Sequence, residues 1–258
     1  MKGKVAVVSG VGPGVGVELV RLFVDEGVKV VMVARDGDRL RAIEAELGGA
    51  GGHIASVSGD IAQAGDCEAV ARVAAERFGR VDTLVNNAFQ MGPWGTLLDT
   101  VADERWSDAF DVNVRGILRM TRAMLPALEA SKGTVVMVNS VAMRTYKPEV
   151  GCYAIAKSGL QAAARYLAME LAPRGIRVNS VVPGYIDGPP LQAAFERMAE
   201  AQGITAATVR DQVTRSLPLQ HIPTSRDVAE AIAFLASPRS RAITGASLDV
   251  NAGEFLPQ

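Results

Sequence analysis

The sequence has few of the residues that build metal centres and disulfide frameworks. Its 258 residues include two cysteines, Cys67 and Cys152, and two histidines, His53 and His221. Two cysteines are too few for a disulfide framework and lack metal-ligand spacing, and two histidines leave almost nothing for a zinc site. We therefore expect a protein of a reducing compartment that binds no metal.

The sequence also lacks an excess of either charge and any long apolar run. Lys and Arg number 27 and Asp and Glu 28, for a formal net charge of −1, and no basic run is present to hold a phosphate backbone. No apolar stretch reaches the roughly 18 residues of a membrane helix, and the amino terminus carries no signal-peptide pattern. With 48% hydrophobic residues, the chain has enough apolar side chains for a full core. We expect a soluble, cytoplasmic globular protein whose partners are neither nucleic acid nor membrane.

Short β-branched runs alternate with longer amphipathic stretches along the chain. Continuous apolar runs predict seven strands buried on both faces, at residues 4–9, 28–34, 53–57, 81–85, 134–139, 177–182 and 247–250. Helical periodicity predicts helices from Val15 and at 38–47, 66–78, 103–128, 152–171 and 225–235, with Gly48-Gly49 and Gly79 as stop signals.

This alternation of strands and helices predicts the fold class. It implies right-handed crossovers and a parallel sheet covered on both faces. No linker, repeat or low-complexity segment interrupts the chain. We expect an α/β protein with a doubly wound, seven-stranded parallel Rossmann-type sheet, in a single domain of residues 1–258.

One segment, at about residues 185–223, departs from the strand–helix rhythm. Two short helical patterns occupy it, directly after the carboxyl end of a predicted strand. Open α/β sheets bind ligands in the crevice outside these strand ends. The segment is predicted to be a substrate lid; the alternative is a packing elaboration at the sheet edge.

A glycine-rich turn follows the first predicted strand and opens a helix. It reads Ser9-Gly10-Val11-Gly12-Pro13-Gly14-Val15-Gly16. Glycines let the backbone turn tightly and approach a pyrophosphate, whose charge is stabilised by the free amides and the dipole of a helix start. Its position inside a βαβ unit favours a dinucleotide site over an ordinary tight turn.

The end of the second predicted strand bears on the choice of cofactor. It reads Val33-Ala34-Arg35-Asp36. An acidic residue at this strand end suits the ribose of NAD, whereas an arginine suits the 2′-phosphate of NADP. Arg35 therefore favours NADP(H), although Asp36 follows it and either pairs with Arg35 or caps the next helix. The alternative is that Arg35 faces solvent and that NAD(H) is the cofactor.

Three polar residues suit the interconversion of a carbonyl and an alcohol. Tyr153 and Lys157 lie four residues apart at the start of a predicted helix and so share one face, and Ser140 closes the preceding strand. A phenol titrates near ~10, so a neighbouring ammonium is needed to stabilise its anion near neutral pH. Such a tyrosine exchanges a proton with a substrate oxygen that the serine hydroxyl holds. A Tyr/Lys pair alone is common on helix surfaces; the glycine turn and Ser140 make the combination specific.

Asn113 falls on an apolar face of the predicted helix 103–128, near Ala109, Phe110 and Ile117. A buried Asn must form hydrogen bonds or it costs free energy. Asn113 either bonds a neighbouring carbonyl or holds a water that links Lys157 to solvent.

The order of these motifs resembles that of the short-chain dehydrogenase/reductase family over nearly the whole chain. The matching positions are Ser9-Gly10-x-x-x-Gly14-x-Gly16, Asp60, Asn86-Asn87-Ala88, Ser140, Tyr153-x-x-x-Lys157 and Pro183-Gly184. The resemblance implies that Tyr153 is the catalytic acid/base, that Lys157 lowers the pKa of Tyr153 and binds the nicotinamide ribose, and that Ser140 orients the substrate oxygen. It further implies that Asn113 supports a proton relay.

The same resemblance implies a set of cofactor contacts. Asp60 and Ile61 would contact adenine, and Asn87-Ala88 the adjacent ribose. Without the resemblance, an Asp at such a strand end is usually a helix cap and an Asn pair is usually turn chemistry. The full set of expected cofactor-binding residues is Ser9, Gly10, Pro13, Gly14, Val15, Gly16, Arg35, Asp60, Ile61, Asn87, Ala88, Tyr153, Lys157, Pro183, Gly184 and Ile186.

Three positions depart from the family pattern. Phe89 stands where Asn-Asn-Ala is usually followed by Gly, and it adds bulk near the cofactor or substrate. Asp187 follows Pro183-Gly184-Tyr185-Ile186, where the family commonly has a Thr that helps to hold the nicotinamide carboxamide. Pro13 occupies a position at which NADP-preferring members often carry a basic residue.

Apolar residues near the expected pocket suit an adaptable substrate site or an ordinary core: Phe89, Met91, Trp94, Met143, Tyr146, Tyr185 and Met198. Arg144 and Lys147 precede Tyr153 on a loop and either attract an acidic substrate group or face water. Cys152, beside Tyr153, is expected to be a packed thiol.

Together these residues predict an NADP(H)-dependent oxidoreductase that interconverts a small-molecule ketone and a secondary alcohol, with Ser140 and Tyr153 contacting the substrate. The alternatives are an NAD-dependent alcohol dehydrogenase of the same family and a non-catalytic nucleotide-binding or scaffolding protein. The resemblance also implies a homotetramer, or a homodimer, built through the helices around Asn113 and Tyr153.

Overall fold

The fold class predicted from the alternating pattern is confirmed. A computed structural model describes residues 1–47 and 52–256. Within these residues the strands form one seven-stranded parallel sheet in the order β3-β2-β1-β4-β5-β6-β7. The strands are β1 (Val5–Ser9), β2 (Lys29–Ala34), β3 (Ile54–Ser58), β4 (Thr83–Asn86), β5 (Thr134–Val138), β6 (Arg177–Pro183) and β7 (Ser247–Val250).

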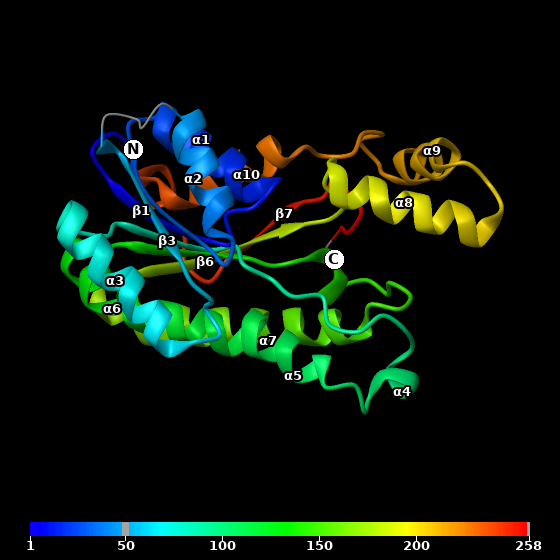
Figure 1. The fold of residues 1–258 in the computed structure, drawn as a ribbon, viewed down its shortest axis with the longest axis horizontal. Helices are drawn as coiled ribbons and strands as arrows, with labels where there is room; N and C mark the ends of the chain where they lie inside the picture. The colour runs from blue at the N-terminus through cyan, green and yellow to red at the C-terminus, as the bar shows by residue number, and fades with distance from the viewer. Residues whose placement is uncertain (48–51, 257–258) are drawn as a thin grey trace.

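Helices cover both faces of the sheet (Figure 1). One face carries α1 (Val15–Asp25), α2 (Gly37–Glu46) and α10 (Ser225–Ala236), and the other carries α3 (Ala64–Phe78), α6 (Ile117–Ser131) and α7 (Gly151–Leu171). The remaining α-helices are α4 (Leu97–Thr100), α5 (Arg105–Phe110), α8 (Pro189–Gln202) and α9 (Ala206–Ser216). Shorter or wider turns are the π-helix η2 (Asp111–Gly116) and the 3₁₀-helices η3 (Val141–Met143), η4 (Ala172–Arg174) and η5 (Pro238–Ser240).

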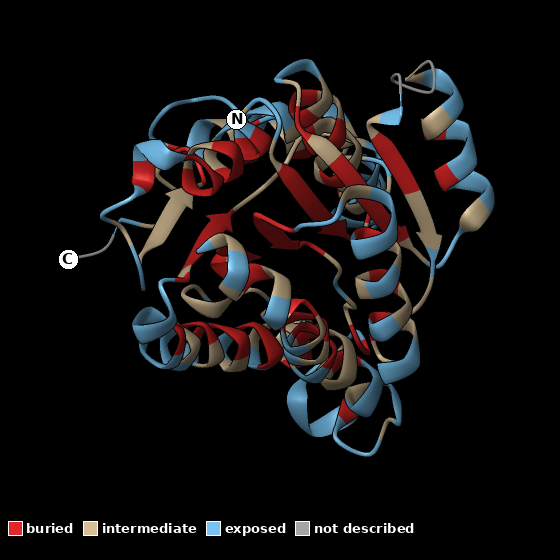
Figure 2. Cartoon of the chain, turned by 90° about the vertical axis from the view of Figure 1, so that its left-hand side faces the viewer, coloured by how far each residue is buried: buried red, intermediate tan, exposed pale blue. Residues whose placement is uncertain are grey.

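Burial on both faces explains the unbroken apolar strands. In β1, Ala6 and Val8 pack with α1 and α10, whereas Val7 packs with α3, α6 and α7 on the opposite side. Because successive strand residues point to opposite faces, a strand between two helical layers needs apolar side chains at every position. Figure 2 shows the result: the central strands are buried, while the helices are buried inward and exposed outward.

The helix predicted at residues 103–128 needs correction. The structure begins it at Arg105, ends it at Ser131 and divides it into α5, η2 and α6. The π-helical segment η2 contains Asn113. A π-turn adds one residue to a helical turn and leaves the apolar periodicity on either side intact, so the sequence pattern reads as one α-helix. The four-residue helix α4 is too short to show such periodicity and is absent from the prediction.

The expected helix ends are mostly found. Gly79 ends α3 in the left-handed conformation, at φ 72°. The helix predicted from Ser225 is α10; Thr224 caps it, and Thr224 and Asp227 form a reciprocal capping box. Gly48 and Gly49, the expected stop after α2, lie outside the described residues.

Two helices, α8 and α9, form the segment predicted as a lid. They extend past the carboxyl ends of the strands, on the same side of the sheet as α1 and α10 (Figure 1). Phe195, Val209 and Val213 form part of a small apolar core of their own. The two predicted helical patterns are therefore confirmed, and the role of a substrate lid stays a prediction.

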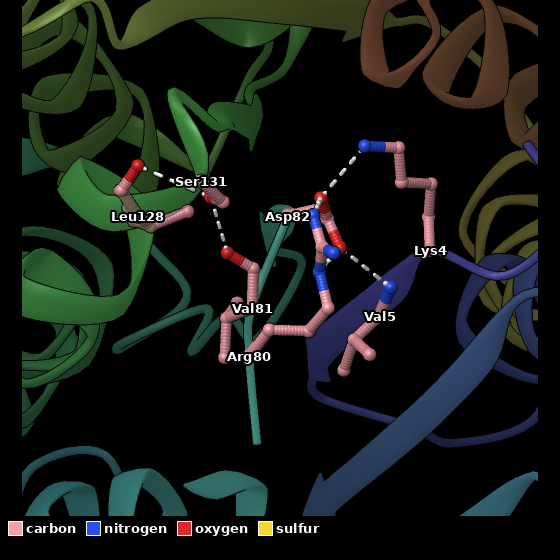
Figure 3. Close-up of polar contacts among 7 residues, drawn as sticks. All are labelled: Lys4, Val5, Arg80, Val81, Asp82, Leu128 and Ser131. Carbon is pink, nitrogen blue, oxygen red and sulfur yellow. Dashed lines mark hydrogen bonds and ion pairs between the residues drawn. The ribbon is translucent and has the colours of Figure 1, made fainter. Parts of the chain in front are cut away.

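The amino and carboxyl ends of the strands differ in structure. At the amino ends, the buried Asp82 carboxylate accepts hydrogen bonds from Lys4, from Arg80 and from the Val5 amide, joining β1 to the start of β4 (Figure 3). At the carboxyl ends, the connections diverge between β1 and β4, because β2 and β3 lie to one side and β5 to β7 to the other. Ligands of open α/β sheets bind at such a switch point.

Candidate active site

The glycine turn after β1 is shaped for close backbone approach. The amides of Gly10 and Val11 both donate to the Val33 carbonyl, at 2.8 and 3.0 Å. A Cβ on Gly10 would lie 2.5 Å from the Ala88 backbone, and one on Gly16 would lie 2.6 Å from the Gly10 carbonyl oxygen. No side chain caps the first turn of α1. The Val17 amide donates to the Gly12 carbonyl at 3.2 Å, so the amides that suit an anion are those that precede it in the turn.

A cleft lies at the carboxyl ends of β1 to β4. Its lining is Gly10, Val11, Gly12, Val33, Ala34, Arg35, Asp36, Arg39, Gly59, Asp60, Ile61, Asn87, Ala88, Phe89, Gln90 and Val112. Six of the predicted cofactor residues are among them: Gly10, Arg35, Asp60, Ile61, Asn87 and Ala88.

The other predicted cofactor residues lie outside this lining. Ser9 is fully buried beneath it, and the Ser9 hydroxyl donates to the Val85 carbonyl at 3.4 Å. Gly14 caps the start of α1, with Pro13 before it and Val15 and Gly16 after it. Beyond the cleft, Pro183 ends β6, and Gly184 and Ile186 follow it. Tyr153 and Lys157 lie on α7.

Arg39 is a cleft residue that the sequence analysis missed. Asp36 is the N-cap of α2; its carboxylate accepts from the Arg39 amide at 3.0 Å and pairs with the Arg39 guanidinium at 3.2 Å. The cap interpretation of Asp36 is thus confirmed, and its ion-pair partner is Arg39 rather than Arg35. The signal that could have found Arg39 was its position in the helix, because a capping Asp36 places the third helical residue beside the glycine turn.

The Asp60 side chain also has a local role. Its carboxylate accepts from the Ala62 amide at 2.9 Å, and the Asp66 carboxylate accepts from the Asp60 amide at 2.7 Å. The N-cap of α3 is Gln63, so Asp60 does not cap that helix. Asn87 likewise supports the cleft, because its side-chain amide donates to the Gly10 carbonyl at 2.7 Å.

Ser140, Tyr153 and Lys157 meet at the same edge of the sheet. Ser140 follows β5 and caps η3, where its hydroxyl accepts from the Ala142 amide at 3.2 Å. Lys157 is 1% exposed and donates to the Val138 carbonyl at 2.8 Å. Its ammonium nitrogen lies 5.6 Å from the centre of the Tyr153 ring.

Burial shifts the two titratable groups in opposite directions. It raises the pKa of the Tyr153 hydroxyl to about 12, and the hydrogen bond with Ser140 opposes this rise. It also lowers the pKa of the Lys157 ammonium to about 7. Both shifts follow because desolvation disfavours the charged form of each group. In the chain alone, the group that lowers the pKa of Tyr153 is Ser140, where we expected Lys157, and burial outweighs it.

Asn113 joins the π-helical segment to the loop after β4. Its side-chain amide donates to the carbonyls of Ala109 and Gln90, at 2.8 and 2.6 Å, and its side-chain oxygen accepts from the Gln90 amide at 3.4 Å. Of the two interpretations of this buried Asn, bonding to neighbouring carbonyls is confirmed. A water relay through Asn113 stays a prediction.

Phe89 lies where the cofactor cleft meets the chemical residues. It lines the cleft, and its ring is edge-on to Tyr153 at 6.2 Å between centroids. Trp94 lies on the same loop, under the guanidinium of Arg197 from α8 at 5.3 Å. Tyr146 is 89% exposed, so its side chain is mostly in solvent.

Two basic residues on the loop before Tyr153 have acidic partners within the chain. Arg144 pairs with Asp249 at 2.6 Å, and Lys147 pairs with Glu254 and lies 4.1 Å from the centre of the Tyr185 ring. Facing water is therefore wrong for these two side chains, which are 17% and 25% exposed, and attraction of an acidic substrate group stays a prediction. Their charges are neutralised by residues more than a hundred positions further along the sequence.

Asp187 also has a structural partner. Both of its carboxylate oxygens accept from Arg210 of α9, at 2.9 and 2.7 Å, and its amide donates to the Pro223 carbonyl at 2.8 Å. This departure from the family pattern thus ties the turn after β6 to α9 and to the chain that follows α9. Cys152 is buried against Gly92, as expected for a packed thiol.

Comparison with known proteins agrees with this geometry. Residues 10–254 match the family model described as enoyl-(acyl carrier protein) reductase. The chain belongs to the short-chain dehydrogenase/reductase family. It is therefore an oxidoreductase of the class that acts on CH–OH and C=O groups.

Individual relatives cover almost the full length of the chain. A putative ketoacyl reductase of Streptomyces coelicolor is 32% identical over 97% of this chain and 96% of its own. A variant of actinorhodin polyketide ketoreductase, solved with NADPH, is 31% identical with a TM-score of 0.90, over 97% of each chain. A 3-ketoacyl-(acyl-carrier-protein) reductase from Brucella melitensis, solved with NADH, is 32% identical with a TM-score of 0.85, over 99% of each chain.

Two features are absent from the described residues. None of the helices there is both long and apolar enough to span a membrane. No group of three or more His, Cys, Asp or Glu side chains in the same residues is placed to hold a metal ion.

Proposed function

We propose that this chain is an NADP(H)-dependent oxidoreductase that interconverts a small-molecule ketone and a secondary alcohol by hydride transfer. The observation that carries the proposal is the meeting of Ser140, Tyr153 and Lys157 at one edge of the sheet, beside the glycine-turn cleft. The relatives solved with nicotinamide cofactors support it.

The residues of the cleft fit a dinucleotide. The uncapped amides at the start of α1 suit its pyrophosphate, and the glycines of the turn leave no Cβ between backbone and ligand. Asp60 and Ile61 would contact adenine, and Asn87 and Ala88 the ribose next to it. The remaining contacts would come from Ser9, Pro13, Gly14, Val15, Gly16, Tyr153, Lys157, Pro183, Gly184 and Ile186.

Two arginines support the preference for NADP(H). Arg35 and Arg39 both line the cleft. Arg35 follows the end of β2, and Arg39 adds a second positive group from α2. Guanidinium groups bind phosphate through charge-assisted, often bidentate, hydrogen bonds. The NADPH-bound ketoreductase agrees with this preference, and the NADH-bound reductase keeps NAD(H) as the alternative to be tested.

The side chains divide the proton chemistry between them. The bound nicotinamide supplies or accepts the hydride. Tyr153 gives its hydroxyl proton to the substrate oxygen during reduction, while the Ser140 hydroxyl donates a hydrogen bond that orients the same oxygen. Lys157 stabilises the resulting phenolate and binds the nicotinamide ribose. Because burial keeps the Tyr153 hydroxyl protonated at neutral pH, the chain alone favours the proton donor that carbonyl reduction requires.

Residues 185–223 are proposed as a substrate lid within a single domain, and Asn113 as support for a proton relay. Homotetramer or homodimer formation is proposed through α6 and α7, which expose Leu118, Ile155, Tyr166 and Met169. Small molecules are the proposed partners, and the cytoplasm is the proposed location.

The experiment is a parallel titration of the purified chain with NADPH and NADH, followed by turnover on a panel of ketones. We expect tighter binding of NADPH and ketone-dependent loss of NADPH absorbance. Tighter binding of NADH would contradict the NADP preference. Binding without turnover on any ketone or alcohol would favour a nucleotide-binding or scaffolding role.

A further inference from the structure

Three successive turns of α7 contact the end of β5. Tyr153 interacts with the hydroxyl of Ser140, and Lys157 donates to the Val138 carbonyl at 2.8 Å. One turn further along the helix, the Gln161 side-chain oxygen accepts a hydrogen bond from the side-chain amide of Asn139 at 3.2 Å. The three helix residues are spaced by four and share one face. Each therefore meets one residue of the segment 138–140.

Gln161 and Asn139 form a connected, buried pair. They are 9% and 3% exposed. The Asn139 side-chain oxygen accepts from the Ser140 backbone amide at 3.0 Å, so the bond to Gln161 continues directly to Ser140. Gln161 is also fixed from the other side, because the Ser247 hydroxyl of β7 donates to the same oxygen at 3.1 Å.

The pair fixes the part of the backbone that aims the Ser140 hydroxyl. Ser140 is extended, at φ −157° and ψ 146°, and it is the last residue before the chain turns into η3. At this bend the amide of Ser140 has its hydrogen-bond partner in Asn139. Without that acceptor, a partly buried amide would have to turn toward a new partner or lose its hydrogen bond. Either change would rotate the hydroxyl away from Tyr153.

We propose that Gln161 and Asn139 are positioning residues for Ser140, setting its hydroxyl relative to Tyr153. This inference rests on the proposed function, because it assigns Gln161 a part in orienting the carbonyl oxygen. A purely structural role for the pair predicts lower stability alone. A positioning role also predicts a slower chemical step and an altered pH profile, since the Ser140 hydroxyl opposes the rise in the pKa of Tyr153.

The test compares Gln161→Met with a matched control, Asn179→Ala. Methionine keeps the length of glutamine and removes the acceptor. Asn179 is a buried side-chain amide on β6, 1% exposed, that donates to the Ile243 carbonyl at 2.9 Å and accepts from the Ala246 amide at 3.0 Å. Asn179→Ala thus removes buried hydrogen bonds that do not lead to Ser140.

In ketone reduction with NADPH, we expect Gln161→Met to lower kcat on the order of tenfold to a hundredfold, with KM for NADPH changed less than about threefold. The alkaline limb of its pH–rate profile should move to higher pH, because Tyr153 loses the stabilisation that Ser140 gives its anion. Asn179→Ala should lower the melting temperature and leave both kcat and the profile near wild type. Gln161→Glu retains an acceptor oxygen and should recover most of kcat.

The inference would be overturned by a folded Gln161→Met with wild-type kcat and pH profile, or by an Asn179→Ala with the same kinetic loss. If Gln161→Met does not fold, Asn139→Ser removes the same bond from the other side and takes its place. A wild-type chain without turnover on any ketone or alcohol would instead overturn the proposed function. The two failures are therefore distinguishable.

Discussion

The two arginines of the cleft illustrate how single side chains set a preference between cofactors. Arg35 is exposed at the end of β2, and Arg39 is held in the first turn of α2 by the Asp36 cap. Because Asp36 pairs with Arg39, its charge is partly neutralised, which lessens its repulsion of a phosphate. The cleft therefore offers a 2′-phosphate two guanidinium groups beside one partly neutralised carboxylate.

We expect Arg35→Ala to weaken NADPH binding by roughly tenfold or more and to change NADH binding little. Arg39→Ala should act in the same direction, because it removes one guanidinium and also frees the Asp36 carboxylate, whose charge repels a phosphate. Fluorescence titration with each cofactor measures the effect. Arg41→Ala is the control, since Arg41 lies on the same helix, pairs with Asp38 and is 72% exposed. Equal losses for NADPH and NADH in Arg35→Ala would contradict a phosphate contact.

Local spacing predicted some of these residues and missed others. Tyr153 and Lys157 share a helix face at a spacing of four, and Ser140 ends a strand, so the sequence alone places all three at one edge. The spacing did not identify Arg39 and Gln161, because their roles depend on residues that the folded chain brings to face them. The role of Gln161 depends on its hydrogen bond with Asn139, 22 positions earlier in the sequence. Helical periodicity does not show which residue outside the helix lies opposite Gln161.

Among the elements, the joint at the amino ends of β1 and β4 stabilises the sheet away from the site (Figure 3). Asp82 is 7% exposed, whereas Lys4 and Arg80 remain nearly half exposed. Burial alone would raise the pKa of the Asp82 carboxyl, but hydrogen bonds from Arg80, the Val5 amide and Lys4 outweigh it and lower the pKa. The ionised carboxylate is thus the form that the fold stabilises.

We expect Asp82→Asn to lower the free energy of unfolding at neutral pH by about 1–3 kcal/mol. Because the folded-state pKa is lowered, the contribution of Asp82 is present above its ordinary value near 3.8 and is lost as the pH falls through the folded value. Denaturant unfolding at several pH values should therefore show wild type and variant converging below about pH 4. A gap that stays constant into acid would contradict the ionic role, and cofactor affinity should be unaffected throughout.

Elements could be predicted where their apolar pattern is long. The buried strands and the helices of both layers follow from unbroken or periodic apolar runs. The π-segment at Asn113 and the four-residue α4 leave no such pattern. The pairing of Arg144 with Asp249 and of Lys147 with Glu254, which fastens the loop before Tyr153 to β7 and the carboxyl-terminal tail, joins segments that only the completed sheet brings together.

At the scale of the whole molecule, the residues that stabilise the sheet and the residues of the candidate active site lie at opposite edges of the sheet. The Asp82 joint lies at the amino edge of the sheet, and the cleft and the Ser140–Tyr153–Lys157 group lie at the carboxyl edge. The α8–α9 pair has its own small core and is anchored at its base by Asp187. This separate core is compatible with the substrate lid proposed for residues 185–223.

The most direct test of the account is the rate of hydride transfer from NADPH to a ketone by Tyr153→Phe. The variant retains the ring that packs against Phe89 and lacks only the hydroxyl. We predict that NADPH binding stays within about threefold of wild type while kcat falls by about 10²- to 10⁴-fold. A variant that binds NADPH and turns over at the wild-type rate would contradict Tyr153 as the acid/base, and with it the mechanism proposed for this site.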